Sequence, residues 1–138
     1  QFRLGLTGAK HMCDKGVCGS CTVIMDGKAV KSCLVMALSV EGKKIVTVEG
    51  LEQNGVLHPL QKAFIAYGAP QCGYCTPGML MAATAFLLHN NAPTKDEVIE
   101  ALSGNLCRCG GYEKYSEAVL AVARGEFGPM PKGCELNV

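Results

Sequence analysis

The stretch CDKGVCGSC, from Cys13 to Cys21, places three cysteines within nine residues, and a fourth, Cys33, follows shortly after. Gly16 and Gly19 lie between these cysteines. Glycines let a backbone fold closely and aim its N–H groups at nearby sulfur atoms. The stretch therefore predicts a loop that binds a ligand through its thiols.

The rest of the chain contains a second set of cysteines. Of the nine in the sequence, eight form two groups of four: Cys13, Cys18, Cys21 and Cys33, and then Cys72, Cys75, Cys107 and Cys109. The total is odd and no secretory signal opens the sequence at Gln1, which argues against a disulfide framework. Groups of four cysteines instead indicate metal sites. Cys134 belongs to neither group, and we expect it to be a free thiol.

The spacing of the first group distinguishes between metals. A C-x4-C-x2-C loop with a distant fourth cysteine is the plant-type ferredoxin pattern for a [2Fe–2S] cluster. Two irons need four thiolates around an elongated, anionic core, which the glycine-containing loop can surround. Structural zinc sites use paired C-x2-C motifs. A zinc site therefore remains an alternative for the second group. For the first group, zinc and disulfides rank behind iron.

Composition excludes several classes of protein. The chain has 138 residues, a formal net charge of +1 and 49% hydrophobic residues, which is typical of a globular protein. The near-neutral charge gives no reason to expect nucleic acid or an anionic membrane as a partner. The longest strongly apolar stretch, residues 79–88, is too short to span a bilayer. With no visible export signal, we expect a cytoplasmic location.

Residues 1–50 have a β-like pattern. The segment CTVIMDGKAVKSCL contains two apolar runs around Asp26 and Gly27, which predicts a hairpin. The alternating segment KKIVTVEG, residues 43–50, predicts a further strand. We therefore expect a small mixed β domain that carries the first cysteine group on a loop.

Residues 51–125 have a helical pattern. Four amphipathic or apolar stretches are expected to be helices, at residues 57–67, 76–91, 94–104 and 112–124. Their short connections favour a compact bundle. We expect Met79, Leu80, Met81 and Phe86 to be core residues, and His58 and His89 to be surface or capping residues.

Local signals predict where these helices begin and end. Thr76 is expected as an N-cap with Pro77 at the first helical position. Thr94 and Glu97 predict a capping box, and Gly104 a helix stop. Both halves of the second cysteine group directly precede a helix. Because a helix N-terminus offers free N–H groups and partial positive charge, it suits an anionic cluster.

Three motifs together resemble a known family. They are GLTGAKHMCDKGVCGSCTV at residues 5–23, QCGYCTPGM at residues 71–79 and GNLCRCGGY at residues 104–112. In this order they are similar to the iron–sulfur small subunit of molybdenum hydroxylases. That is the xanthine dehydrogenase family, which includes aldehyde oxidoreductases and carbon monoxide dehydrogenases. The resemblance covers residues 4–125.

The resemblance implies an α+β fold. Residues 1–50 would form a plant-type [2Fe–2S] ferredoxin-like (β-grasp) domain that lacks the N-terminal strands usual in the family. Residues 51–125 would form a four-helix [2Fe–2S]-binding domain, and residues 126–138 a C-terminal tail. Gly110 stands where the family commonly has threonine, which removes a hydroxyl near a cluster.

The resemblance also implies the cofactors and partners. The two cysteine groups would bind one [2Fe–2S] cluster each. Gln71 matches a glutamine that hydrogen-bonds molybdopterin, and Cys109 a cysteine that both ligates iron and contacts the pterin. The partners would be a large molybdopterin-binding subunit and a medium FAD-binding subunit, in a heterotrimer or its dimer.

The expected function is electron transfer within an oxidoreductase complex, with no substrate chemistry on this chain. The two clusters would relay single electrons from molybdopterin to FAD, and Arg108 could tune their potential or act as a solvated or interface residue. Two alternatives remain open from the residues themselves. One is a free-standing [2Fe–2S] redox carrier or sensor, and the other is a zinc-binding interaction module.

Overall fold

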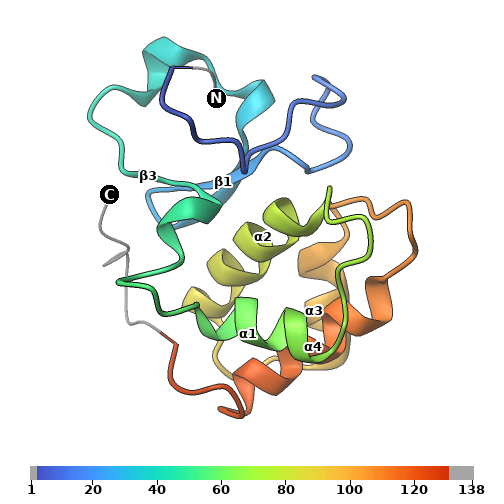
Figure 1. The fold of residues 1–138 in the computed structure, drawn as a ribbon. Helices are drawn as coiled ribbons and strands as arrows, with labels where there is room; N and C mark the ends of the chain where they lie inside the picture. Colours follow the sequence, from blue (N-terminus) through green and yellow to red (C-terminus); the bar gives the residue numbers. More distant parts are fainter. Residues whose placement is uncertain (1–2, 131–138) are drawn as a thin grey trace.

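The computed structural model describes residues 3–130 and combines a small sheet with four helices (Figure 1). The strands are β1 (Thr22–Met25), β2 (Lys28–Lys31) and β3 (Ile45–Val46). The helices are α1 (Pro59–Ala66), α2 (Thr76–His89), α3 (Lys95–Leu102) and α4 (Tyr112–Ala123). Short 3-10 turns are η1 (Ser32–Leu34), η2 (Ala37–Val40) and η3 (Val48–Gly50). This arrangement confirms the expected α+β class.

The sheet is antiparallel, with strand order β2-β1-β3. Asp26 and Gly27 connect β1 to β2 with φ angles of 48° and 80°. Two successive positive φ angles define the type I′ turn, whose twist matches that of the strands it joins. The predicted hairpin is therefore confirmed, with Val23 opposite Val30 and Ile24 opposite Ala29.

The strand expected over residues 43–50 is much shorter than predicted. Only Ile45 and Val46 pair with β1, and the chain then turns into η3. The next polar side chains bind the loop that precedes the first cysteine group. The Glu49 carboxylate accepts a hydrogen bond of 2.7 Å from the Gly8 N–H and one of 2.5 Å from the Thr47 hydroxyl. The backbone turn at η3 brings the Glu49 carboxylate to the Gly8 N–H. The alternating pattern of residues 43–50 therefore wrongly predicted a strand over the whole segment.

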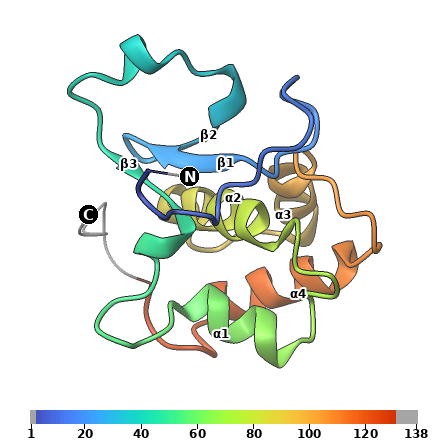
Figure 2. The ribbon, with the colours of Figure 1, turned by 45° about the horizontal axis from the view of Figure 1, so that its top comes forward.

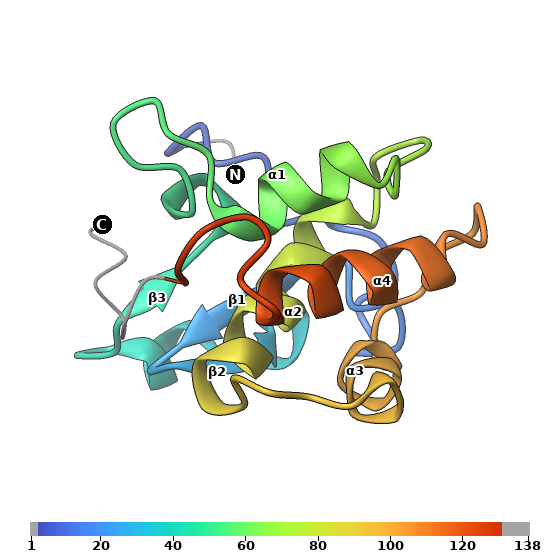
Figure 3. The same ribbon diagram turned by 90° about the horizontal axis from the view of Figure 1, so that it is seen from below.

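Helix α2 is the central element of the fold. The sheet packs on one side of it, and α1 and α4 lie on the other (Figures 2 and 3). Every residue from Gly78 to Ala85 is buried, and Leu87 is buried as well. A helix that is apolar on all sides requires neighbours on all sides. No helix within residues 3–130 has both the length and the apolarity needed to cross a membrane.

Strands and helices share one hydrophobic core. Ile24 and Val46 from the sheet belong to the same cluster of buried side chains as Phe64, Met79 and Tyr115 from the helices. Of the four residues predicted as core, Met79, Leu80 and Met81 are buried and Phe86 is partly buried against them. The division of the chain at residue 50 stays a prediction, because a shared core does not define separate folding units.

Two of the predicted helix signals need correction. Cys75, not Thr76, is the N-cap of α2, so Thr76 lies inside the first turn and Pro77 follows it. The Thr76 hydroxyl is instead within 2.9 Å of the Tyr115 hydroxyl. Helix α3 ends at Leu102, two residues before Gly104, and Gly104 does not adopt the left-handed backbone of a glycine stop.

The predicted capping box at α3 is confirmed. The Thr94 hydroxyl accepts a hydrogen bond of 3.3 Å from the Glu97 N–H, and the Glu97 carboxylate accepts one of 2.7 Å from the Thr94 N–H. Reciprocal bonds of this kind satisfy two N–H groups that the helix itself cannot.

His58 caps α1 from a buried position. The His58 Nδ1 accepts a hydrogen bond of 3.2 Å from the Leu60 N–H, and the His58 backbone N–H donates to the Gln61 side-chain oxygen at 2.8 Å. Of the two expected positions, surface or cap, the structure shows the cap, and His58 is only 3% exposed. An acceptor at Nδ1 fixes the neutral ring with its proton on Nε2. Within residues 3–130, Nε2 has no hydrogen-bond partner.

This cap should make stability depend on pH. Burial lowers the pKa of His58 to about 4, whereas an exposed histidine titrates near 6.5. Between these values the unfolded chain binds the proton and the folded chain does not, so stability falls as the pH decreases from about 6.5 towards 4. We expect the loss to reach roughly 3 kcal/mol. Urea unfolding of the cluster-loaded chain across this range measures it.

The matched control is His58→Asn, which keeps an N-cap acceptor but cannot titrate. Its unfolding free energy should vary less with pH than that of the wild type over the same range. Parallel pH profiles for the two proteins would show that His58 is not the responsible group.

Candidate metal centres

The fold brings each cysteine group together, and all eight are free thiols. Three cysteines of the first group lie on the loop before β1, and Cys33 lies in η1. In the second group, Cys72 and Cys75 directly precede α2, while Cys107 and Cys109 lie in the loop before α4. Both sites are therefore made of segments that are distant in the sequence.

In the first group the thiols approach each other in pairs. The Cys13 thiol interacts with that of Cys18, and the Cys33 thiol with that of Cys21. All four line one cavity of about 560 Å³. Cys18 and Cys21 are buried and the other two are half-buried. The loop and η1 thus bring the four cysteines of this group around a common space.

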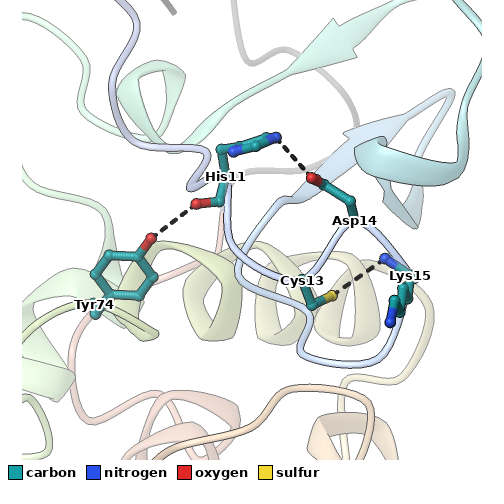
Figure 4. Close-up of polar contacts among 5 residues, drawn as sticks. All are labelled: His11, Cys13, Asp14, Lys15 and Tyr74. Atoms are coloured by element: carbon teal, nitrogen blue, oxygen red, sulfur yellow. Dashed lines mark hydrogen bonds and ion pairs between the residues drawn. The ribbon is translucent and has the colours of Figure 1, made fainter.

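The loop backbone supplies hydrogen bonds to this group. The Cys13 sulfur accepts a hydrogen bond of 3.5 Å from the Lys15 N–H (Figure 4). It accepts a second one of 3.5 Å from the Cys18 N–H. The Cys18 and Lys15 N–H groups lower the pKa of the Cys13 thiol to about 6. Positive φ angles of 69° at Gly16 and 71° at Gly19 allow this close folding.

The second group also forms two pairs, which differ in burial. The Cys72 thiol interacts with that of Cys109, and both residues are exposed. The Cys75 thiol interacts with that of Cys107, and both are buried. Burial raises the pKa of the Cys75 thiol to about 11, whereas the N–H of Tyr74 lowers the pKa of Cys72. One side of this site faces solvent and the other faces the core.

Backbone groups near α4 complete the second site. The Cys107 sulfur accepts the Gly111 N–H at 3.4 Å. The Cys107 N–H in turn donates to the Tyr112 hydroxyl at 2.8 Å. Because Gly111 is the N-cap of α4, a helix N-terminus faces this sulfur, as the sequence predicts.

The donor set and its pairing fit two diiron clusters. A [2Fe–2S] cluster held by cysteines needs four thiolates, two at each iron. Each group offers four sulfur atoms in two interacting pairs. Across residues 3–130, no three His, Cys, Asp or Glu side chains are arranged to hold a single metal ion.

Other residues expected at the site have the following positions. The Gln71 side-chain amide donates to the Cys109 carbonyl at 3.3 Å, and Arg108 is exposed. Gly110 has a φ of 75°, and nothing lies within 4 Å of where a Cβ would be, so its backbone rather than crowding favours glycine. His89 is exposed and donates to the Gly27 carbonyl at 3.1 Å. Cys134 lies outside the described residues.

Three hydrogen bonds join the two cysteine loops. The Leu106 N–H donates to the Cys18 carbonyl at 2.9 Å. The buried Asn105 amide donates to the Gly19 carbonyl at 3.0 Å. On the outer side, the Tyr74 hydroxyl donates to the His11 carbonyl at 3.1 Å (Figure 4). Neither Asn105 nor Tyr74 was predicted as a site residue from the sequence, although both lie within two residues of a cysteine.

The loops approach so closely that side chains are excluded at two positions. A Cβ added to Gly19 would lie 2.5 Å from the Gly104 carbonyl oxygen and 2.7 Å from the Asn105 amide nitrogen. A Cβ on Gly78 in α2 would lie 2.3 Å from the Gly19 carbonyl oxygen. Real Cβ atoms do not tolerate such distances, so glycine is required at both positions.

Two family models match the chain. One is described as a [2Fe-2S] binding domain and matches residues 47–120. The other is described as a 2Fe-2S iron-sulfur cluster binding domain and matches residues 8–64. Together they cover both cysteine groups.

Similar curated proteins are subunits of oxidoreductases. The chain is 58% identical over 123 residues to the nicotine 6-hydroxylase small subunit of Paenarthrobacter nicotinovorans, covering 89% of this chain and 73% of that protein. It is 47% identical over 118 residues to the xanthine dehydrogenase iron-sulfur-binding subunit of Escherichia coli O157:H7, covering 84% of this chain and 74% of that protein.

Similar solved structures have the same fold. Quinoline 2-oxidoreductase from Pseudomonas putida 86 matches with a TM-score of 0.83 and 52% identity, over 88% of this chain and 76% of that chain. Aldehyde oxidoreductase from Desulfovibrio gigas matches with a TM-score of 0.83 and 43% identity, over 89% of this chain but 14% of that longer chain.

The contact between the two loops can be tested with two glycine substitutions. Gly19→Ala combines a positive φ with a clash against Gly104 and Asn105, so we expect a loss of stability of about 2 kcal/mol or more. Chemical unfolding of the cluster-loaded chain, followed by visible absorption, measures this loss.

Gly73→Ala is the matched control, since Gly73 also has a positive φ, of 80°, but nothing lies within 4 Å of its added Cβ. It should lose only the backbone contribution, roughly 1–2 kcal/mol. Equal losses in the two variants would contradict a tight contact at Gly19.

Proposed function

The chain belongs to the family of iron–sulfur subunits of molybdenum hydroxylases, and we propose that it carries electrons between a molybdenum centre and a flavin within such a complex. Its role in the complex is electron transfer, and the relatives are named as subunits, which favours this role over a free-standing carrier. The observation that carries the proposal is the pair of four-thiol groups whose loops are hydrogen-bonded to each other.

We assign one [2Fe–2S] cluster to each group. The first would be held by Cys13, Cys18, Cys21 and Cys33, and the second by Cys72, Cys75, Cys107 and Cys109. The observed pairs suggest which two thiols share an iron. When bound, such clusters supply one-electron transfer, so two of them can pass on the two electrons of a hydroxylation one at a time.

The protein residues hold the two sites at a fixed separation and control access of water. Backbone N–H groups reach the sulfur atoms of Cys13 and Cys107. The buried pair of the second group is shielded by the core, whereas Cys109 is open to a partner. Hydrogen bonds to sulfur and limited solvent exposure are the protein's means of setting a cluster potential.

The exposed side of the second group is the proposed contact with molybdenum. Gln71 and Cys109 lie together there, joined by a hydrogen bond, and both are free to contact another chain. We propose that they contact molybdopterin on a large subunit. The first group would then lie towards a medium FAD-binding subunit, in a heterotrimer or a dimer of heterotrimers.

The relatives suggest a substrate class for the whole complex. Nicotine, xanthine and quinoline, in the names of three of the four proteins compared above, are nitrogen heterocycles. We propose hydroxylation of a nitrogen heterocycle on the partner subunit. A cytoplasmic location fits the chemistry, because a reducing compartment keeps thiols available to iron.

Replacing one buried ligand should remove one cluster. In Cys107→Ser we expect the iron content of the purified complex to fall by half, because the second group keeps only three thiolates. One of the two [2Fe–2S] signals in the electron paramagnetic resonance (EPR) spectrum should disappear, and turnover with a flavin-side acceptor should cease.

Cys33→Ser provides the matched comparison, since it should remove the other signal. Cys134→Ala should leave the iron content unchanged. Undiminished turnover in Cys107→Ser, or loss of iron in Cys134→Ala, would contradict the ligand assignment.

A further inference from the structure

A tyrosine side chain from α4 contacts the buried pair of the second cysteine group. The Tyr115 hydroxyl lies 3.6 Å from the Cys75 sulfur and 2.9 Å from the Thr76 hydroxyl. Tyr115 is 1% exposed, and its ring packs edge-on against Phe64 at a centroid distance of 4.9 Å. The phenol is therefore held in one orientation towards the sulfur.

The chemistry of the ligand decides which atom donates. A free thiol could donate to the phenol, but a thiolate bound to iron has no proton and can only accept. The phenol and the Thr76 hydroxyl each have one proton and can also accept. If Cys75 binds iron, all three groups are satisfied when Thr76 donates to Tyr115 and Tyr115 donates to the sulfur.

We propose that Tyr115 donates a hydrogen bond to the Cys75 ligand and thereby raises the reduction potential of the second cluster. This inference rests on the proposed function, because it requires Cys75 to be an iron ligand. Reduction adds one negative charge to the cluster, and part of that charge resides on its sulfur atoms. An O–H dipole directed at sulfur stabilises the reduced form more than the oxidised form.

Burial makes this contact effective. Water cannot replace the phenol at a sulfur that faces the core, and hydrogen bonds are electrostatically stronger in a low-dielectric interior. The first group differs in this respect, because the N–H groups that reach Cys13 belong to the loop backbone. Tyr115 thus adjusts one cluster without touching the other, and makes the second cluster a better electron acceptor than it would be without the phenol.

The test is Tyr115→Phe in the intact complex, with each cluster titrated by potentiometry and followed by its EPR signal. A hydrogen bond contributes about 1 kcal/mol. We expect the equilibrium constant for reduction of the second cluster to fall about fivefold, which is about 40 mV for one electron. The potential of the first cluster should not change, and the iron content should stay the same.

A second readout detects the hydrogen bond itself. After exchange into D₂O, the reduced second cluster should show a deuterium coupling from the phenol, and Tyr115→Phe should lack it. Thr76→Val keeps the phenol and leaves it the sulfur as a partner, so the coupling should persist and the potential should not fall. If Tyr115→Phe does not fold, the deuterium coupling and the potential of Thr76→Val and of the wild type still test the hydrogen bond to sulfur.

Tyr74→Phe is the matched control. It removes the same atom from a tyrosine next to the same ligands, but this hydroxyl donates to the His11 carbonyl and not to sulfur. The potential of the second cluster should stay unchanged in this variant. Equal shifts in the two Tyr→Phe variants, or an unchanged potential in Tyr115→Phe, would overturn the inference. Fewer than two clusters in the wild-type complex would instead refute the proposed function.

Discussion

The close contact between the two cysteine loops is the constraint on which the arrangement of the molecule depends. Gly19, Gly78 and Asn105 come from three distant segments and meet with no space for another carbon atom. The Asn105 amide is buried at this junction and donates to the Gly19 carbonyl. A buried amide without a hydrogen-bond partner costs free energy. The buried Asn105 amide has its Gly19 partner only while the two loops are in contact. The separation of the two sites is thus fixed by packing and not by a linker.

This constraint has a direct meaning for electron transfer. Electron tunnelling slows steeply with distance, so a relay needs its sites at a constant, short separation. The hydrogen bond from Leu106 to the Cys18 carbonyl connects the residue before Cys107 directly to a cysteine of the first group. A path of covalent backbone and one hydrogen bond therefore runs between the two cysteine groups.

Signals that depend on a few neighbouring residues could be predicted from the sequence. The hairpin at Asp26 and the capping box at Thr94 depend on local backbone chemistry, and both were found as expected. The first cysteine group was predicted from its spacing, which is itself the chemical requirement, whereas the spacing of the second group left zinc open and only the resemblance implied a cluster there. Predictions failed where the role of a residue depends on a partner that is distant in the sequence. Thr76 binds Tyr115 instead of capping its helix, and Asn105 has a role only because Gly19 lies beside it.

Helix α2 has a consequence for how such proteins diverge. One side of it covers the sheet and the other side belongs to the helical bundle, so a single stretch of sequence is shared by both halves. In a hybrid that joins the first half of one relative to the second half of another, the sheet would pack against the α2 helix of a different protein. Such a hybrid would therefore need matching side chains on α2 and on the strands that pack against it.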